Sequence, residues 1–146
     1  MSWLPKTKVV VPIDFSTASE NSLRTALELV KQPADVHVLH VVPPLDALAY
    51  GEIEMWHTEN VASRRQAAER FLADFLKQHG FANTTSAVLV GDPGLGISEY
   101  AREQGADLIV LPSHGYHGIK RVLLGSVAER VLRHAPCEVL VLRRKD

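Results

Sequence analysis

The sequence predicts an α/β fold, a single doubly wound unit in which a five-stranded parallel sheet carries helices on both faces. Two observations predict it. Short aliphatic runs alternate along the chain with amphipathic stretches long enough for helices, which is the pattern of repeated βα units. These runs show little alternation with polar residues, so each strand is expected to be covered on both faces. At 146 residues, the chain is expected to form one domain over residues 1–146.

Five runs are rich enough in β-branched and aliphatic residues to be predicted as strands. The second reads VHVLHVV and the fifth reads EVLVL. In chain order, the predicted strands are Lys8–Ile13, Val36–Val42, Ser86–Val90, Asp107–Leu111 and Glu138–Leu142.

Two helices are predicted before the third strand from apolar residues spaced three and four apart. A capping box formed by Thr17 and Glu20 is expected to begin the first helix, and Gly80 is expected to end the second. The apolar stripes comprise Leu23, Ala26, Leu27 and Val30 in the first helix and Ala68, Phe71, Leu72, Phe75 and Leu76 in the second.

Two more helices are predicted in the second half of the chain. The third begins with Asp92 as N-cap and Pro93 in the first turn. The fourth begins with a capping box of Ser126 and Glu129, and Pro136 ends it. Their apolar residues are Ile97, Tyr100 and Ala101 in the third helix and Val127, Val131 and Leu132 in the fourth.

The loops after the first and fourth strands are the expected place for a ligand. In an open parallel sheet, ligands bind beyond the carboxyl ends of the strands, where the strand order reverses. This rule points to Asp14-Phe15-Ser16 and Ser113-His114-Gly115. The connection Pro43–Asn60 is also unusually long. Either it is a lid or binding segment, or the next helix begins earlier, near Tyr50.

Composition narrows the classes of partner. The chain has 16 Lys and Arg residues against 17 Asp and Glu residues, so it lacks the positive field of a nucleic-acid or anionic-lipid binder. Apolar runs such as Val9–Ile13 are too short to span a bilayer. The single cysteine, Cys137, rules out an intramolecular disulfide and is expected to be a buried small hydrophobe. We therefore expect no nucleic acid, no membrane and a cytoplasmic location.

The segment after the fourth strand has the features of a phosphate site. Its glycines are Gly115, Gly118 and Gly125. Without a Cβ, glycine allows the backbone to approach a ligand closely, and amides beside the helix start at Ser126 form an anion nest at a positive dipole end. Lys120 and Arg121 add positive charge between them.

A family resemblance appears in the segment LIVLPSHGYHGIKRVLLGSVAERVLRHAPCEVLVLR. This segment resembles the signature of universal stress proteins, whose nucleotide-binding branch carries G-x2-G-x9-G-[ST]. Gly115, Gly125 and Ser126 match three of the four motif positions, and Pro112 stands at the first glycine. The stretches VPIDFS, VGDP and APCEVLVL resemble the family's first strand and turn, its third-strand exit and its last strand. The resemblance covers the whole chain.

The resemblance implies a sheet in the order 3-2-1-4-5, as in the adenine nucleotide alpha hydrolase-like fold, and a stress-response regulator that binds ATP, or ADP or AMP, with or without Mg²⁺. In relatives, the residue matching Asp14 contacts the ribose or phosphates, and the backbone at the position of Val41 meets adenine. The resemblance also implies a homodimer through Glu138–Leu142 and an unidentified protein partner. The implied cofactor-binding residues are Pro12, Ile13, Asp14, Val41, Leu111, Pro112, Ser113, His114, Gly115, Gly118, Gly125, Ser126 and Val127.

Several of these residues also have a purely structural interpretation. Asp14 alternatively forms an Asx turn before the first helix, and Ser126 alternatively only caps its helix. His37 and His40 are expected to be structural residues of the second strand. His114 flanks the glycines, where a histidine either hydrogen-bonds a phosphate or acts as an acid or base near neutral pH.

Two rival functions remain open. Pro112 has no N–H and carries a ring that would crowd the sugar of a bound nucleotide. This feature favours a nucleotide-free, dimeric protein-interaction module of the same family. The other rival is a weak ATPase that uses Asp14 or His114. No catalytic and no metal-ligating residues are predicted, because the sequence has no P-loop, no nucleophile elbow and no metal-ligand spacing. The chain is therefore expected not to be a dedicated enzyme.

Overall fold

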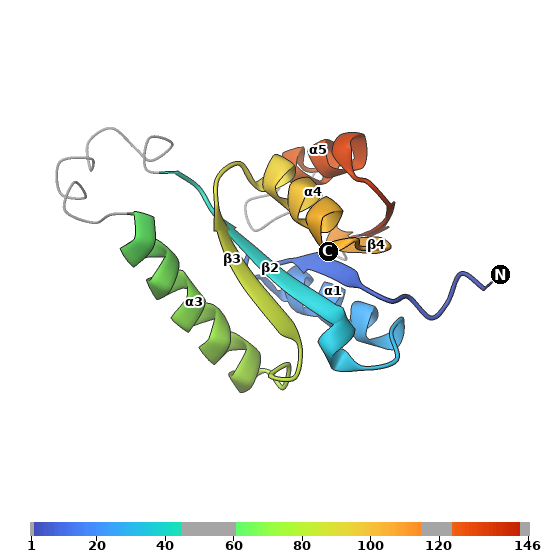
Figure 1. The fold of residues 1–146 in the computed structure, drawn as a ribbon, viewed down its shortest axis with the longest axis horizontal. Coiled ribbons are helices and arrows are strands. Elements are labelled where there is room, and N and C mark those ends of the chain that lie inside the picture. The colour runs from blue at the N-terminus through green and yellow to red at the C-terminus, as the bar shows by residue number, and fades with distance from the viewer. Residues whose placement is uncertain (1, 45–60, 115–123, 144–146) are drawn as a thin grey trace.

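The computed structural model describes residues 2–44, 61–114 and 124–143. Strands and helices alternate along these ranges (Figure 1). In chain order they are β1 (Val9–Pro12), α1 (Thr17–Glu28), the 3-10 helix η1 (Pro33–Asp35), β2 (Val36–Val42), α3 (Val61–Gln78), β3 (Thr85–Val90), α4 (Pro93–Gln104), β4 (Leu108–Pro112), α5 (Ser126–His134) and β5 (Glu138–Leu142).

The strands form one parallel sheet in the order β3-β2-β1-β4-β5 (Figure 1). This confirms the predicted fold class and strand order. β1 pairs with β2 along its whole length, but it pairs with β4 only at Val9↔Leu108 and Val10↔Ile109. The strand order reverses between β1 and β4, so the expected ligand crevice lies there.

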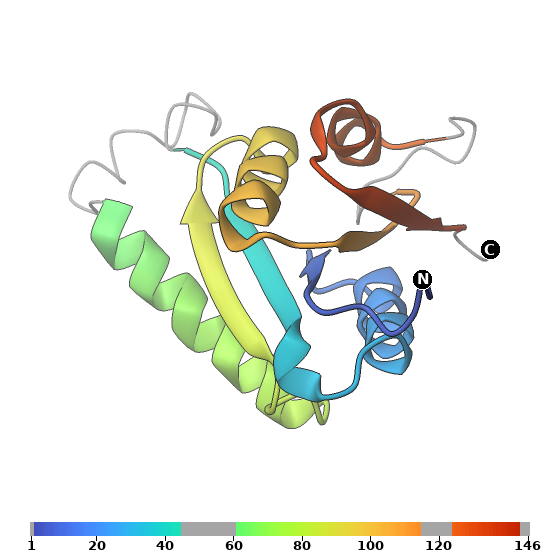
Figure 2. The same ribbon diagram turned by 45° about the vertical axis from the view of Figure 1, so that its right-hand side comes forward.

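Helices cover both faces of the sheet (Figure 2). α1 and α3 pack on one face, and α4 and α5 pack on the other. Successive residues of β1 enter opposite cores, which is why the strand reads as a continuous apolar run. The first core includes Val9, Val11, Leu23, Val38, Leu72 and Val110, and the second includes Val10, Leu39, Ile97, Ile109, Leu111 and Val131.

Two predicted helix starts were wrong. α1 is capped by Ser16, whose Oγ accepts a hydrogen bond from the backbone N–H of Ser19 at 3.3 Å, and not by Thr17. The N-cap of α5 is Gly125, so Ser126 is its first helical residue. An N-cap residue needs an extended backbone, and φ and ψ are −81° and 166° at Ser16 and −72° and 162° at Gly125. The sequence pattern placed each cap one residue too late.

Three residues of the predicted apolar stripes are exposed, contrary to expectation. Phe71 is 59% exposed, Val127 38% and Leu132 45%. α5 packs through Ala128 and Val131 instead. The outer members of a wide apolar stripe stay in solvent on a helix that covers a sheet, and Val127 is exposed because it lines a cavity at the edge of the sheet.

Cys137 lies just before β5 and is half-buried against the second core. Burial raises the pKa of its thiol, and the carboxylates of Glu138 and Asp107 raise it further. The thiolate is therefore a minor species near neutral pH, which fits the predicted structural role.

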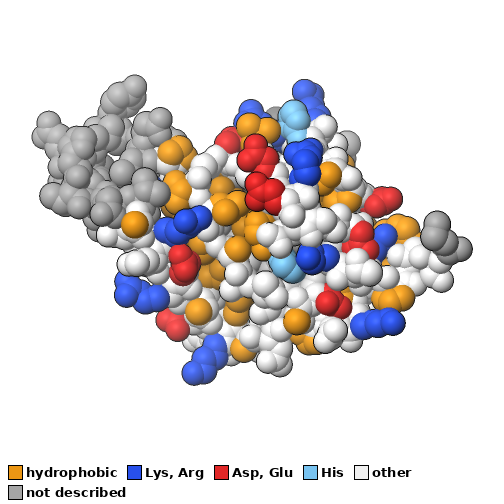
Figure 3. Space-filling view, viewed as in Figure 1, with side chains coloured by type: hydrophobic (Ala, Val, Ile, Leu, Met, Phe, Trp, Pro, Cys, Tyr) orange, Lys and Arg blue, Asp and Glu red, His pale blue; other side chains and the backbone are white. Residues whose placement is uncertain are grey.

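On the face shown in Figure 3, Lys and Arg side chains are interspersed with Asp and Glu side chains. Within the described ranges, no helix combines the length and apolarity that crossing a membrane requires. The predicted lid or early helix start in Pro43–Asn60 falls mainly on residues 45–60, which lie outside the described residues.

Candidate functional site

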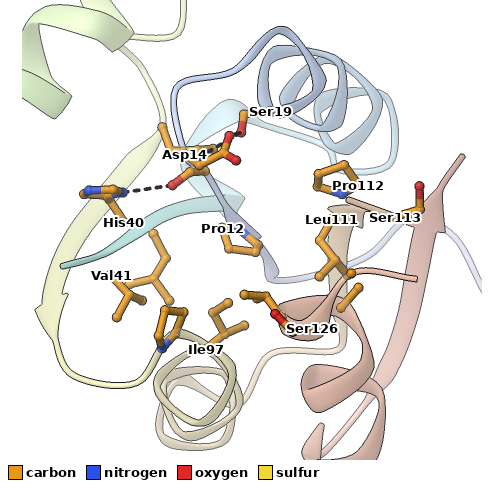
Figure 4. A pocket seen from close by; sticks show the side chains of 16 residues that line it. Pro12, Asp14, Ser19, His40, Val41, Ile97, Leu111, Pro112, Ser113 and Ser126 are labelled. Carbon is orange, nitrogen blue, oxygen red and sulfur yellow. Dashed lines mark hydrogen bonds between the residues drawn. The ribbon is translucent and has the colours of Figure 1, made fainter. Parts of the chain in front are cut away.

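A cavity of about 330 Å³ lies at the carboxyl edge of the sheet, where β1 and β4 part (Figure 4). This is the size range of small-ligand sites, and it is where the switch-point rule placed a ligand. Its lining residues are Pro12, Ile13, Asp14, Ser19, Leu39, His40, Val41, Pro93, Ile97, Leu111, Pro112, Ser113, Gly125, Ser126, Val127 and Ala128.

Most of the predicted site residues are brought together in this lining. His114 does not line the cavity, but its Nδ1 lies 3.1 Å from Oγ of Ser113, which does. Gly115 and Gly118 lie outside the described residues, as do Lys120 and Arg121. The contribution predicted for the centre of the glycine loop is therefore still a prediction.

The two ends of the glycine loop are joined beside the cavity. The N–H of Gly125 donates to the carbonyl of Ser113 at 2.6 Å, and the N–H of Ser113 donates to the carbonyl of Leu142 at 2.9 Å. These bonds tie the loop base to the last strand. They hold the start of α5 against the end of β4, so that Ser126 and Val127 reach the cavity wall.

α1, α4 and α5 all begin beside the cavity, but their first turns differ. Ser16 caps α1, and Oδ2 of Asp92 accepts from the N–H of Leu95 at 3.0 Å to cap α4, as predicted. The N-cap of α5, Gly125, has no side chain with which to accept a hydrogen bond. The first N–H groups of a helix have no partner within the helix. Those of α5 therefore present positive partial charge at the cavity.

Asp14 makes the predicted turn at the end of β1. Its Oδ1 accepts from the N–H of Ser16 at 3.1 Å and from Oγ of Ser19 at 2.7 Å, while its own N–H donates to Oγ of Ser19 at 2.9 Å. The Asx-turn interpretation is therefore realised. Because Asp14 also lines the cavity, the same turn holds a carboxylate at the cavity wall.

His40 is a cavity residue that sequence reasoning treated as purely structural. Its Nδ1 lies 2.9 Å from the carbonyl of Ile13, and since a carbonyl only accepts, Nδ1 carries the proton. Its ring lies 4.6 Å from the ring of Phe15. A polar residue near the carboxyl end of an otherwise aliphatic strand was the available signal. Ser19, Leu39, Pro93, Ile97 and Ala128 were also missed.

One wall of the cavity is apolar. Leu39 and Val41 of β2, Ile97 of α4 and Leu111 of β4 form it. A Cβ added at Gly96 would lie 3.7 Å from Cγ1 of Val41, so α4 approaches β2 closely at this wall. Such a surface suits the faces of a flat heterocycle.

Among the described residues, no three His, Cys, Asp or Glu side chains gather as a metal site would require. Asp92 borders the cavity through Pro93. The N–H of Leu95 and the guanidinium of Arg130 together hold the pKa of Asp92 below its ordinary value, against the opposing effect of burial.

Comparison with known proteins finds relatives over almost the whole chain. The sequence profile of the universal stress protein family matches residues 6–143. The chain is 35% identical to universal stress protein MJ0531 of Methanocaldococcus jannaschii over 141 residues, which cover 94% of this chain and 82% of that protein.

Solved structures give the same relationship. Hypothetical protein MJ0577 superposes with a TM-score of 0.78 at 27% identity, over 98% of this chain and 99% of that chain. A universal stress protein in complex with cAMP superposes with a TM-score of 0.60 at 25% identity, over 94% of this chain and 97% of that chain.

Proposed function

The chain belongs to the universal stress protein family, and from this premise we propose that it binds an adenine nucleotide in the cavity between β1 and β4. The nucleotide is ATP, or its products ADP or AMP, with or without Mg²⁺. One relative of similar fold was solved with cAMP, which is also an adenine nucleotide. The cavity occupies the switch point at which this class of sheet binds ligands.

The start of α5 is the observation that carries the proposal. Gly125 leaves the first N–H groups of the helix uncapped by a side chain, and Ser126, Val127 and Ala128 all line the cavity. Backbone amides at a helix N-terminus bind phosphate well, because the donors and the helix dipole act together. The nucleotide phosphates therefore lie at α5.

The opposite wall accommodates the base. Val41 and Ile97 offer apolar surface to a purine ring, and the backbone at the end of β2 lies within the same wall. Asp14 lies between the two ends, where it meets the sugar or the phosphates. This arrangement uses the predicted residues on β1, β2, β4 and α5 and adds His40, which was not predicted.

We assign the protein a regulatory role in the stress response, in which bound nucleotide changes recognition of a protein partner. The unpaired Cys137 fits the reducing conditions of the cytoplasm. Nucleotide-free protein binding and weak ATP hydrolysis are the rival functions that the test must separate.

Isothermal titration calorimetry of ATP against the wild type and two variants at one position tests the proposal. Gly125→Asp places a carboxylate at the N-cap, where it occupies the amides and repels phosphate, while adding about 0.5–2 kcal/mol of helix stability relative to alanine. We expect it to weaken ATP binding by about ten-fold or more. Gly125→Ala leaves the amides free of a carboxylate, and the backbone there suits any residue. It adds a Cβ at the cavity wall, so the effect of the charge is the difference in ATP affinity between Gly125→Asp and Gly125→Ala.

Three results would count against the proposal in different ways. No heat with ATP, ADP or AMP would favour the nucleotide-free module. Equal affinity of the wild type and Gly125→Asp would remove the phosphates from α5. Phosphate release by the wild type well above that of Gly125→Asp would turn the proposal towards an ATPase.

A homodimer through β5 is part of the same proposal. Leu142 accepts from the N–H of Ser113, so its peptide group faces β4, and by alternation those of Val139 and Val141 face away from the sheet. β5 is an edge strand, and an apolar edge with such groups pairs readily with a second strand. A second copy of the same strand gives an isologous contact.

Sedimentation velocity at micromolar concentration tests the dimer. Val141→Pro removes an outward N–H without touching the ladder to β4, and proline is tolerated on edge strands. We expect a dimeric wild type, a dimeric Val141→Ala control and a monomeric Val141→Pro. A monomeric wild type would contradict the proposed dimer.

A further inference from the structure

The side chain of Arg130 on α5 lies across Gly94 in the first turn of α4. A Cβ added at Gly94 would lie 2.6 Å from Cδ of Arg130 and 2.7 Å from its Cβ and its Cγ. Non-bonded carbon atoms prefer separations of about 3.5–4.0 Å. Because the Cβ of Arg130 is attached directly to the backbone of α5, rotation of the side chain does not clear it. The two helices therefore meet at a separation that requires glycine at position 94.

The far end of the same side chain is anchored at the start of α4. Nη1 of Arg130 donates to Oδ1 of Asp92 at 2.9 Å, and Asp92 is the N-cap of α4. This ion pair is exposed to solvent, so it stabilises the fold little by itself, but it keeps the stem of Arg130 extended over Gly94. We call Asp92, Gly94 and Arg130 the α4–α5 clamp.

A second contact ties the far ends of the two helices. Nη2 of Arg102, in the last turn of α4, donates to the carbonyl of His134 at the end of α5 at 3.2 Å. The helices lie side by side (Figure 1, Figure 2), and they run in the same direction because start meets start and end meets end. Ala128 and Val131 hold the inner face of α5 against the second core. With the far end and the inner face fixed, the clamp sets how far the first turn of α5 lies from α4.

The clamp lies about one helical turn from the cavity. Pro93 and Ile97 of α4 line the cavity on either side of Gly94 in the sequence, and Ser126 of α5 lines it one turn before Arg130. Gly94 and Arg130 themselves are not among the lining residues. A shift of the first turn of α5 relative to α4 therefore moves the first amides of α5 relative to the apolar wall at Ile97.

We propose that the α4–α5 clamp is a positioning device for the nucleotide. Gly94 and Arg130 fix the distance between the apolar wall of α4, which faces the base, and the amides of α5, which bind the phosphates. This inference rests on the proposed nucleotide binding. Base and phosphates belong to one molecule, so the two anchors act together only where their spacing matches the ligand. The clamp residues act through the two helices and not by touching the ligand.

Isothermal titration calorimetry of ATP against Gly94→Ala tests the clamp. The new Cβ must retreat from 2.6 Å to van der Waals distance, which moves the start of α5 away from α4 by about 1 Å. Hydrogen bonds stretched by that much no longer form. We expect the ATP affinity of Gly94→Ala to be about ten-fold or more below that of the wild type.

A rescue series identifies the clash as the cause. Arg130→Gly removes all three carbon atoms that a Cβ at position 94 would meet, whereas Arg130→Ala keeps the Cβ at 2.7 Å. We therefore expect Gly94→Ala/Arg130→Gly to recover most of the ATP affinity lost in Gly94→Ala. Gly94→Ala/Arg130→Ala should recover little. The two double variants carry the same charge, so electrostatic attraction of the ligand does not distinguish them.

Gly96→Ala is the matched control, because it makes the same substitution in the same helix. Its Cβ would lie 3.7 Å from Cγ1 of Val41, which is an ordinary van der Waals contact. Its ATP affinity should stay close to that of the wild type. Urea unfolding, measured in parallel, shows whether each variant is folded under the conditions of the titration.

A second pair of variants tests the clamp without a clash and decides the question if Gly94→Ala does not fold. Arg130→Gln keeps carbon atoms at Cβ, Cγ and Cδ, whereas Arg130→Ala keeps only Cβ. Both replacements remove the charge, and glutamine and alanine are both good helix formers. We expect Arg130→Ala to bind ATP several-fold more weakly than Arg130→Gln, because its shortened side chain no longer holds α5 against α4.

The outcomes separate this inference from the proposed function. No binding of ATP by the wild type overturns both. Equal ATP affinity of the wild type and a folded Gly94→Ala overturns the clamp and leaves nucleotide binding in place. Equal recovery in the two double variants, or equal affinity of Arg130→Ala and Arg130→Gln, shows that the packing of the Arg130 stem does not position the ligand.

Discussion

The Nδ1 atom of His37 on β2 lies 2.8 Å from the hydroxyl oxygen of Tyr100 on α4. His37 is 8% exposed and Tyr100 9%, so this hydrogen bond joins the sheet to a covering helix inside the protein. Tyr100→Phe removes the hydroxyl and leaves a buried nitrogen without its partner. We expect the free energy of unfolding in urea to fall by about 1–3 kcal/mol.

A double-mutant cycle is the control for this hydrogen bond. His37→Leu in the Tyr100→Phe background removes both polar groups, so the double variant is expected to lose less stability than the two single variants predict together. Strictly additive losses would show that the two side chains do not depend on each other.

The same histidine makes stability depend on pH. Burial lowers the pKa of His37 from its ordinary value of 6.5, and Lys8 lowers it further while Asp35 opposes. The unfolded chain therefore binds a proton at position 37 at a higher pH than the folded chain does. The stability from neutral His37 is present above pH 6.5 and is lost as pH falls toward the lowered folded pKa.

Urea unfolding at several pH values from neutral into the mildly acidic range measures this dependence. His37→Gln has no titrating group at this position, so its stability should fall less steeply with falling pH than that of the wild type. Parallel pH profiles for the two proteins would mean that His37 titrates alike in the folded and unfolded states.

Asp92 has two roles that substitution can separate. It caps α4 through the N–H of Leu95 at 3.0 Å, and its Oδ1 lies 2.9 Å from Nη1 of Arg130 on α5. Asp92→Ala removes both contacts and is expected to cost about 1 kcal/mol, mostly from the lost cap. Asp92→Asn keeps a capping oxygen and loses only the ion pair. Because this ion pair is exposed, its loss is expected to cost about a few tenths of a kcal/mol.

Chemical denaturation of the wild type and both variants above about pH 5 provides the measurement. In this range Asp92 of the wild type is ionised in the folded and unfolded chains alike. The pKa of Asp92 is lowered from 3.8 by the N–H of Leu95 and by Arg130. Its stabilising effect is therefore present above pH 3.8 and is lost as pH falls through the folded pKa. If Asp92→Asn were as unstable as Asp92→Ala, the stabilisation by Asp92 would come from the ion pair and not from the cap.

The strands could be predicted almost to the residue, because a strand covered on both faces leaves a local signal. Val36–Val42 and Glu138–Leu142 match β2 and β5 in full, and the other strands are offset by a residue or so. Asp14 and Ser113 could be placed at one edge because the carboxyl ends of parallel strands lie together. Both residues line the cavity.

The parts that escaped prediction depend on contacts between distant segments. Ile97 reaches the cavity only because α4 packs over the end of β2, and nothing in its own neighbourhood marks it. The opening between β1 and β4 begins beyond the pairs Val9↔Leu108 and Val10↔Ile109, and a register between two strands is not contained in either strand alone. The cap of α1 was predicted wrongly for another reason, since Ser16 and Thr17 are adjacent hydroxyl residues and the backbone geometry chooses between them.

Phe15 combines a strained backbone with good side-chain packing, and this combination predicts an unusual order of stabilities. Its φ is 67°, a left-handed value that costs an ordinary residue about 1–2 kcal/mol. Its ring packs edge-on against Phe71 at 4.8 Å and Phe75 at 5.2 Å. Phe15→Ala loses the ring and keeps the strain, whereas Phe15→Gly loses the ring and relieves the strain. We therefore expect the glycine variant to be the more stable by about 1 kcal/mol.

Phe75 gives the matched control, because it belongs to the same aromatic cluster but lies inside α3. In a helix interior glycine is less favourable than alanine by about 1 kcal/mol. Phe75→Gly should thus be less stable than Phe75→Ala, the reverse of the order at Phe15. Thermal unfolding of the four variants decides the question. The same order at both positions would show that the backbone at Phe15 is not held in the left-handed conformation in solution.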